Sequence, residues 1–154
     1  MHTNSRFAVA IHILTLMAYK REQALTSEYI ARSVTTNPVV IRRTLGDLRR
    51  AGLVASHPGA GGGWRLLRSP ERITLLDAYH AVGEGLPFAL PPHPPNPQCR
   101  VGRAIQQAVT GYFEEAEAAM QRRFADITIA QALAEVETPR HTSSCMQADP
   151  AASA

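Results

Sequence analysis

The stretch NPVVIRRTLGDLRRAGLVASHPGAGGGWRL, residues 37–66, contains the pattern on which the fold prediction depends. It opens with Asn37-Pro38, a strong helix start. Asparagine caps a helix, and proline fits the first turn, where its missing N–H would be unpaired anyway. The predicted helix runs to about residue 51, and Gly52 follows as a left-handed cap. The quoted stretch therefore begins with one helix of defined start and end.

This predicted helix has an apolar seam and a basic surface outside it. Three apolar side chains share one face at helical spacing: Ile41, Leu45 and Leu48. Four arginines lie outside that seam as two pairs, each seven residues apart and therefore on one stripe: Arg42 with Arg49, and Arg43 with Arg50. The pattern predicts a helix that packs on one side and presents positive charge on the other.

The second half of the stretch predicts a two-stranded hairpin. Residues 53–57 and 64–67 are the expected strands, and the six residues 58–63 between them include four glycines. Upstream, residues 5–20 and a short segment after Thr26, ending near residue 33, have helical patterns. Thr26 is a good N-cap, and Glu28 lies in the first turn, where the helix dipole favours negative charge. Helix, short helix, basic helix and glycine-tipped hairpin occur in the order of a winged helix-turn-helix.

This order predicts a duplex DNA interface. A helix of ordinary width enters the major groove, so the start of the basic helix should meet base edges while its flank reaches phosphates. A glycine loop can approach the DNA backbone without side-chain clash. The predicted contacts come from the two helix starts, the basic face and the wing: Thr26, Ser27, Thr36, Asn37, Val39, Val40, Arg42, Arg43, Arg49, Arg50, His57, Gly61, Gly62 and Arg65.

The chain beyond the hairpin predicts a second, elongated part. Thr74 caps a helix through residue 82, and residues 87–97 hold six of the eleven prolines and cannot be helical. A long helix follows, at about residues 101–124, and then a short one at 128–133. The expected organisation is a DNA-binding domain at 1–86, a Pro-rich loop at 87–99, a long and a short helix at 100–137, and a disordered tail at 138–154.

Charge and composition narrow the function classes. Residues 1–72 hold eleven basic and four acidic residues, whereas residues 73–154 hold five basic and nine acidic ones. This asymmetry favours a polyanionic partner for the first half. No apolar run is long enough to span a membrane and the start lacks a signal-peptide pattern, so we expect a cytoplasmic protein without membrane contact. The glycine run is no phosphate loop and no catalytic motif is present, so we expect no enzyme.

Several motifs in order resemble the Rrf2 family of regulators, which includes IscR and NsrR, and most closely its cluster-free, YwnA-like branch. The resemblance covers roughly residues 3–135. It rests on residues 37–66, on the RITLLDAY block that begins at Arg72 and on the CRVGRAIQ block that begins at Cys99. It implies a mainly α protein: a winged helix-turn-helix with a two-stranded wing and a long C-terminal dimerisation helix. It also implies a homodimer that binds a pseudo-palindromic operator, usually as a repressor.

The sequence departs from this family at two places. Cluster-binding members carry three cysteines before the long helix, and here only Cys99 remains, so we expect no cofactor and no metal within one chain. IscR-type members have an arginine before the first wing glycine, where this chain has Pro58. Contacts of the wing with the minor groove then depend on His57 or Arg65, or are weak.

Three alternatives stay open at this stage. Cys99 at a helix start, with Arg100 and Arg103 nearby, has the surroundings of a redox-sensing thiol, although an incidental cysteine fits as well. His93 and Cys99 from two subunits together could make an iron–sulfur or metal site. Cys145, in the tail, has no assigned role. The third alternative is a protein-interaction module without DNA binding, which would show no salt-dependent duplex affinity.

Overall fold

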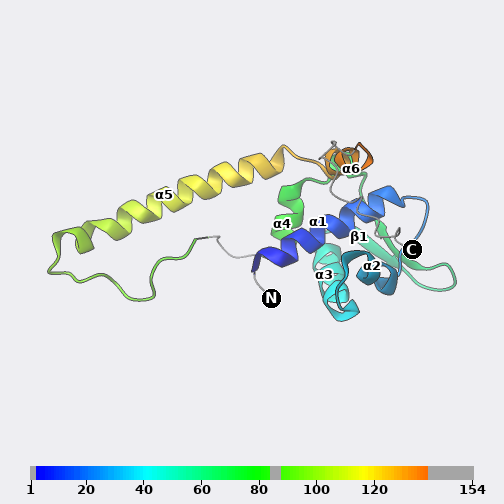
Figure 1. Cartoon of the computed structure of the whole chain (residues 1–154), viewed down its shortest axis with the longest axis horizontal. Coiled ribbons are helices and arrows are strands. Elements are labelled where there is room, and N and C mark those ends of the chain that lie inside the picture. The colour runs from blue at the N-terminus through cyan, green and yellow to red at the C-terminus, as the bar shows by residue number, and fades with distance from the viewer. Residues whose placement is uncertain (1–2, 84–87, 139–154) are drawn as a thin grey trace, which may run out of the picture.

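A computed structural model of the chain describes residues 3–83 and 88–138. It is a mainly α fold with one two-stranded hairpin, and a long helix extends away from the rest of the molecule (Figure 1). The elements follow in the order α1 (Thr3–Tyr19), α2 (Ser27–Val34), α3 (Pro38–Arg50), β1 (Val54–His57), β2 (Gly63–Leu66), η1 (Pro70–Arg72), α4 (Leu75–Ala81), α5 (Arg100–Ala125) and α6 (Ile129–Glu137). The predicted winged helix-turn-helix is confirmed.

The helix-turn-helix is set by local capping. The Thr26 hydroxyl accepts a hydrogen bond from the Tyr29 N–H, and the Asn37 side chain accepts one from the Val39 N–H. Each of these two hydrogen bonds provides an acceptor for an N–H that has none within the helix. Between the helices Thr35 adopts a left-handed conformation with φ of 58°, and Gly52 beyond α3 has φ of 69°. The helix starts and the glycine stop predicted from sequence are therefore confirmed.

The wing is an antiparallel hairpin that is fastened at its base to the preceding segment. Val54 pairs with Leu66, and His57 pairs with Gly63 at the end of the ladder. Leu25 forms a bridge to Trp64 through two backbone hydrogen bonds of 2.8 and 3.0 Å. A Cβ on Gly63 would lie 2.8 Å from the Leu25 carbonyl oxygen, so this close approach requires glycine. The wing is thereby anchored beside the start of α2.

The core lies between α1, α2, α3, the hairpin base, α4 and the start of α6. Its buried residues come from every one of these elements: Ala10, Ile13, Leu14, Met17, Ala18, Leu25, Ile30, Ala31, Ile41, Leu45, Leu48, Leu53, Val54, Ile73, Ala78, Val82 and Ile129. Ile41, Leu45 and Leu48 are fully buried, as the seam of the basic helix predicted. Burial of this seam determines which face of α3 stays exposed.

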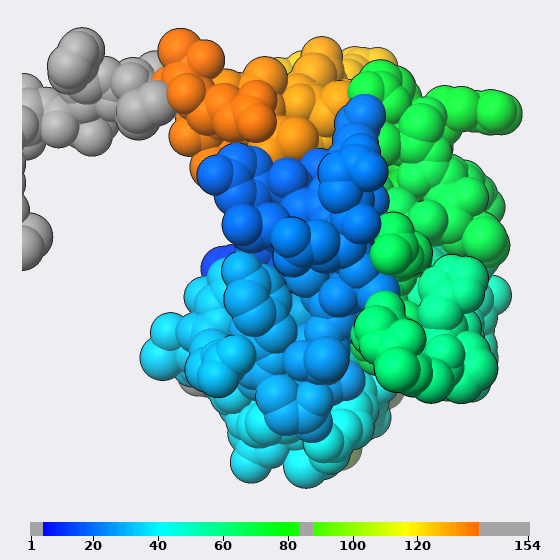
Figure 2. All heavy atoms as spheres, turned by 90° about the vertical axis from the view of Figure 1, so that its right-hand side faces the viewer, coloured from blue at the N-terminus to red at the C-terminus, as the bar shows by residue number. Residues whose placement is uncertain are grey.

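Helix α6 returns to this body after α5. Thr74 and Thr128 form an isolated bridge, and the Ile129 N–H donates to the Ile73 carbonyl at 2.8 Å. In the space-filling view orange α6 covers blue α1 on the side away from cyan α3 (Figure 2). The structure extends α6 beyond the expected residue 133, to Glu137. Packing thus joins α6 to the N-terminal body, although it follows the long helix in sequence.

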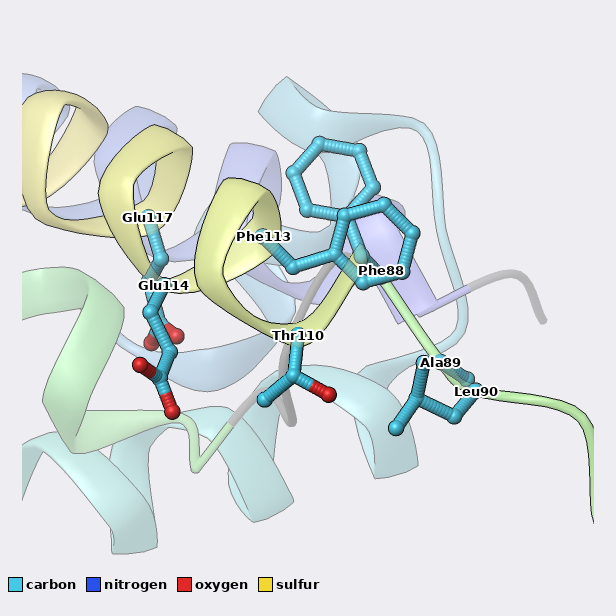
Figure 3. Close-up of a pocket in the computed structure, with 7 residues that line it drawn as sticks. All are labelled: Phe88, Ala89, Leu90, Thr110, Phe113, Glu114 and Glu117. Carbon is cyan, nitrogen blue, oxygen red and sulfur yellow. The ribbon is translucent and has the colours of Figure 1, made fainter. Parts of the chain in front are cut away.

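Helix α5 has no buried residue in the described part of the chain. Only its end meets the body, where Phe124 packs against Phe7 and Tyr79 with ring centroids 5.1 and 6.0 Å apart. The Pro-rich segment runs along its other end. Phe88 stacks on Phe113 at 4.9 Å, beside a cavity of about 450 Å³ (Figure 3). The predicted long helix is confirmed, whereas the predicted tail after residue 138 lies outside the described residues.

Candidate nucleic-acid interface

The exposed face of α3 carries the four arginines predicted from sequence. Arg42, Arg43, Arg49 and Arg50 are all exposed, opposite the buried seam of the same helix. The two stripes have different neighbours, because one lies toward α2 and the other toward the start of α1 and the end of α4. The face as a whole presents positive charge on a helix of suitable width for a major groove.

The first turn of α3 presents small and polar groups. Val39 is 64% exposed, while Thr36 and Val40 are half-buried. The side-chain oxygen Oδ1 of Asn37 accepts the capping hydrogen bond from the Val39 N–H at 2.8 Å. Its amide group remains available as a donor, because an asparagine side chain has two N–H bonds in addition to the oxygen. A side chain that caps a helix and still has donors free can bind a base edge or a phosphate.

The start of α2 is less accessible than predicted. The exposed Thr26 uses its oxygen as acceptor from Tyr29, and its hydroxyl proton remains available. Ser27, in contrast, is only 8% exposed. Of the predicted contacts in this helix, Thr26 therefore presents a donor at the surface and Ser27 presents almost none.

One arginine of the face already has a carboxylate partner. Arg42 donates to Glu28 of α2 at 2.5 Å, and both side chains are more than half exposed. A backbone hydrogen bond lowers the pKa of Glu28, and the Arg42 guanidinium lowers it further. Glu28 is therefore charged at neutral pH, and it holds Arg42 toward the second helix.

A second carboxylate lies on the other side of α3. Asp47 is buried, and its two oxygens accept from Arg50 on the same helix and from Arg6 of α1. Neither Arg43 nor Arg49 has an ion-pair partner within residues 3–83 and 88–138. These two arginines offer unpaired charge on α3, whereas Arg42 and Arg50 are oriented by acids.

The wing presents its predicted residues on one outer face. Trp64 and Leu66 pack against the core, so His57 and Arg65, which alternate with them in the ladder, face away from it. Arg65 also donates to the Glu22 carbonyl at 3.4 Å. At the tip Gly61 has φ of 72°, and a Cβ on Gly62 would lie 2.3 Å from the His57 carbonyl oxygen. Both glycines are required by the turn itself.

Two participants were missed by sequence reasoning. Glu28 was read only as a first-turn acid, although it pairs with Arg42 fourteen positions away. Arg6 was not considered at all, although it reaches Asp47 across a separation of 41 residues. Arg6 is the one charged residue in the first turns of α1, directly before the apolar run that begins at Phe7, and this is the only signal in the sequence that could have indicated it.

Comparison with known proteins agrees with this geometry. The Rrf2 family, described as iron-dependent transcriptional regulators, matches residues 3–135. The Bacillus subtilis helix-turn-helix regulator YwnA is 42% identical over 122 residues, which are 79% of this chain and 90% of YwnA. An rrf2-like regulator of Rhodobacter capsulatus is 32% identical over 68% of this chain and 64% of its own length.

Solved structures show the same fold. One, described as a DNA-binding protein, is 38% identical with a TM-score of 0.67, and the match covers 83% of this chain and 98% of that one. The structure of IscR from T. potens is 22% identical with a TM-score of 0.69 over 94% of each chain. The fold of the chain is thus that of these regulators.

The iron named in the family description does not fit the donors of this chain. Cys99 is exposed at the N-cap of α5, and His93 lies in the exposed loop before it. Within the described residues no three His, Cys, Asp or Glu side chains gather as a metal site would require. An iron–sulfur cluster needs several thiolates, and one cysteine in the loop is too few. Cys145 lies outside the described residues.

None of the helices in the described part of the chain combines the length and apolar character needed to cross a membrane.

Proposed function

Because this chain belongs to the Rrf2 family of DNA-binding transcriptional regulators, we propose that it is a homodimeric repressor that binds a pseudo-palindromic operator. The family consists of transcriptional regulators and not of enzymes. The observation that carries the proposal is the exposed arginine face of α3 beside the glycine-tipped wing. This pair of features matches a major groove and the adjoining backbone.

Within this interface the residues have distinct roles. The first turn of α3 meets base edges, through Thr36, Asn37, Val39, Val40, Arg42 and Arg43. The later arginines of α3 and the start of α2 meet the DNA backbone, through Arg49, Arg50, Thr26 and, least of all, Ser27. The wing contributes His57, Gly61, Gly62 and Arg65. Exposure supports most of these assignments, whereas Thr36, Val40, Gly62 and Arg65 are half-buried and Ser27 is buried.

The homodimer is supported by α5. Its apolar side chains Val101, Ile105 and Tyr112 are 66, 44 and 67% exposed, which is unusual for a helix of 26 residues without a partner. A second α5 crossing the first would cover them. Two recognition helices would then lie roughly 34 Å apart, at successive major grooves on one side of the duplex.

Selection of duplexes from a random pool tests DNA binding and supplies the operator in one experiment. We expect a two-half-site consensus, and a binding constant that falls steeply with salt, because several phosphates are neutralised. Failure to enrich any duplex would overturn the proposal, and so would affinity that does not depend on salt. An operator placed across a promoter then tests repression, since the bound protein should lower transcription in a purified system.

The signal is proposed to act through Cys99. This thiol is exposed at the N-cap of α5, beside Arg100, so an oxidant in solution can reach it. Peroxide should release the wild-type protein and the Cys145→Ser variant from operator DNA, but not the Cys99→Ser variant. Equal release of all three proteins would exclude the thiol as the sensor and leave a small effector as the signal.

A further inference from the structure

A positively charged hollow lies beside α3, and four arginines surround one aspartate there. It has a volume of about 550 Å³ and is lined by Arg6, Arg42, Arg43, Asp47 and Arg50. Residues 81–83, at the end of α4, complete its wall. We call this hollow the arginine basin. It combines Arg6 of α1 with side chains of α3 that lie 36 or more positions further along the chain.

Asp47 is the centre of the basin and holds two of its arginines. Its side chain is only 8% exposed, and each oxygen accepts from a different guanidinium. The Arg6 Nη2 lies 2.5 Å from Oδ2, while Arg50 donates to Oδ1. Because a guanidinium has five N–H donors in a planar fork, each arginine retains donors after pairing with Asp47. The carboxylate therefore fixes the direction of two forks without using them up.

Positive charge exceeds negative charge in the basin. Four guanidinium groups are accompanied by Asp47 and by Glu28, which pairs with Arg42 outside the hollow. The lining of the hollow therefore carries three positive charges in excess, or two when Glu28 is counted with it. Arginine forks bind phosphate oxygens with matched geometry. The chemistry of the basin is thus that of a receptor for a phosphate group.

The position of the basin decides which phosphate it would bind. It adjoins the exposed face of α3, and the start of α1 and the end of α4 form its far side. If α3 occupies a major groove, structures that flank the helix stand over the backbone that borders that groove. This step rests on the proposed function, because it takes the DNA-bound position of α3 as given.

We propose that the arginine basin binds a backbone phosphate of the operator, with Arg6 as a DNA contact from α1 and Asp47 as the positioning residue. The first helix then takes part in binding through a side chain that the helix-turn-helix pattern does not indicate. Specificity stays with α3, because a phosphate contact has the same chemistry at every sequence.

The Arg6→Gln variant tests the contact. Its affinity for the selected operator should fall about tenfold for each protomer, and the slope of log affinity against log salt should fall by about 1.8, because each of the two protomers loses one phosphate contact at about 0.9 apiece. A non-cognate duplex should lose the same factor. Arg123→Gln is the matched control, because this exposed arginine lies in the last turn of α5, and that end of the helix leads to α6, away from α3 (Figure 1).

The Asp47→Asn variant separates positioning from simple charge. Removing a negative charge near DNA should strengthen binding by ordinary electrostatics, whereas loss of the oriented forks should weaken it. We expect several-fold weaker binding. Should Asp47→Asn fail to fold, Arg6→Lys replaces it, since lysine keeps the charge but has no planar fork and should still lose affinity.

The outcomes separate this inference from the proposed function. If the wild-type protein binds no duplex, the proposed function fails. If the wild type binds and Arg6→Gln equals Arg123→Gln in affinity and salt slope, the inference alone is overturned. Titration of the free protein with inorganic phosphate, followed by NMR of the arginine side chains, tests whether the basin binds a free phosphate ion rather than a DNA phosphate. Tight binding of free phosphate, with Arg6→Gln unaltered toward DNA, would make the basin a small-anion site instead.

Discussion

The N-terminal body and helix α5 use apolar side chains in opposite ways. In the body Ile13, Leu45 and Ile73 are fully buried, whereas on α5 Val101 and Tyr112 are about two-thirds exposed. Both parts have apolar residues at helical spacing, so periodicity alone does not distinguish them. The difference teaches that the body buries its apolar face within one chain, while the apolar side chains of α5 stay exposed, as the proposed dimer would require.

The largest effect should come from disrupting that outside surface. Replacing Ile105 and Tyr112 together by aspartate should convert the proposed dimer to a monomer, because the charges would be buried against a second α5. Affinity for the two-half-site operator should then fall about 100-fold or more, since simultaneous binding of both half-sites is lost. Sedimentation measures the mass, and fluorescence anisotropy measures the affinity.

The control variant carries the same two charges on the opposite side of α5, as Gln107→Asp with Ala118→Asp. It should remain dimeric and bind DNA as the wild type does. If the Ile105 and Tyr112 variant also remained dimeric, the exposed seam of α5 would not be the interface, and the contrast between the two regions would lose its explanation.

A core substitution in the body should have the next largest effect. Leu45→Ala should lower the free energy of unfolding by about 2–5 kcal/mol, because it removes a fully buried side chain and leaves a cavity. Urea denaturation measures this cost, which should be the same at low and high protein concentration. Ile105→Ala should instead lose stability in a concentration-dependent way. A concentration-independent loss for Ile105→Ala would place α5 within the core of a single chain.

Substitution of the cap residue of α3 should have a smaller effect, and two variants separate its part in protein stability from its part in DNA affinity. Asn37→Ala should destabilise the protein by about 1 kcal/mol, because the Val39 N–H loses its acceptor. Asn37→Ser should retain stability, since serine caps equally well, but it should lose DNA affinity, since one hydroxyl donor on a shorter side chain replaces the two amide donors. Thermal unfolding and DNA titration together check both. Unchanged affinity in Asn37→Ser would remove this side chain from the interface.

The smallest effect is expected at Glu28. Glu28→Gln should bind DNA a few-fold more tightly, because it frees Arg42 and removes a negative charge from the interface. Glu71→Gln is the control: its pKa is also lowered, first by a backbone hydrogen bond, and its partner Arg21 lies away from α3. Weaker binding by Glu28→Gln would mean that the ion pair positions Arg42 for the duplex.

The pKa of Glu28 sets the pH at which its pair acts. Because a backbone hydrogen bond and then Arg42 lower this pKa in the folded protein, the contribution of charged Glu28 to stability is present above the ordinary glutamate value and is lost as pH falls through the lowered one. We therefore expect the difference in the free energy of unfolding between Glu28→Gln and the wild type to be constant around neutral pH and to vanish in acid.

Most elements could be predicted because their signals are local. Thr26, Asn37 and Gly52 mark helix ends by their own conformational chemistry, and the structure shows them in these roles. The glycines of residues 59–63 likewise predict the turn of the hairpin from local sequence alone. The short turn of η1 was missed, because three residues around Pro70 produce no periodicity. The candidate contacts stay predictions, apart from the finding that Ser27 is buried.

The sequence by itself determined where helices begin and end, which face of each is apolar, and that a basic helix precedes a glycine-tipped hairpin. These properties depend on neighbours within a few residues. Only the tertiary structure decided which charges meet. Arg6 and Asp47 lie 41 positions apart, Glu28 reaches across from another helix to Arg42, and α6 returns to cover α1. Such pairings arise because packing of the apolar faces brings together side chains that are distant in sequence. Patterns within a few residues of the chain do not predict these contacts.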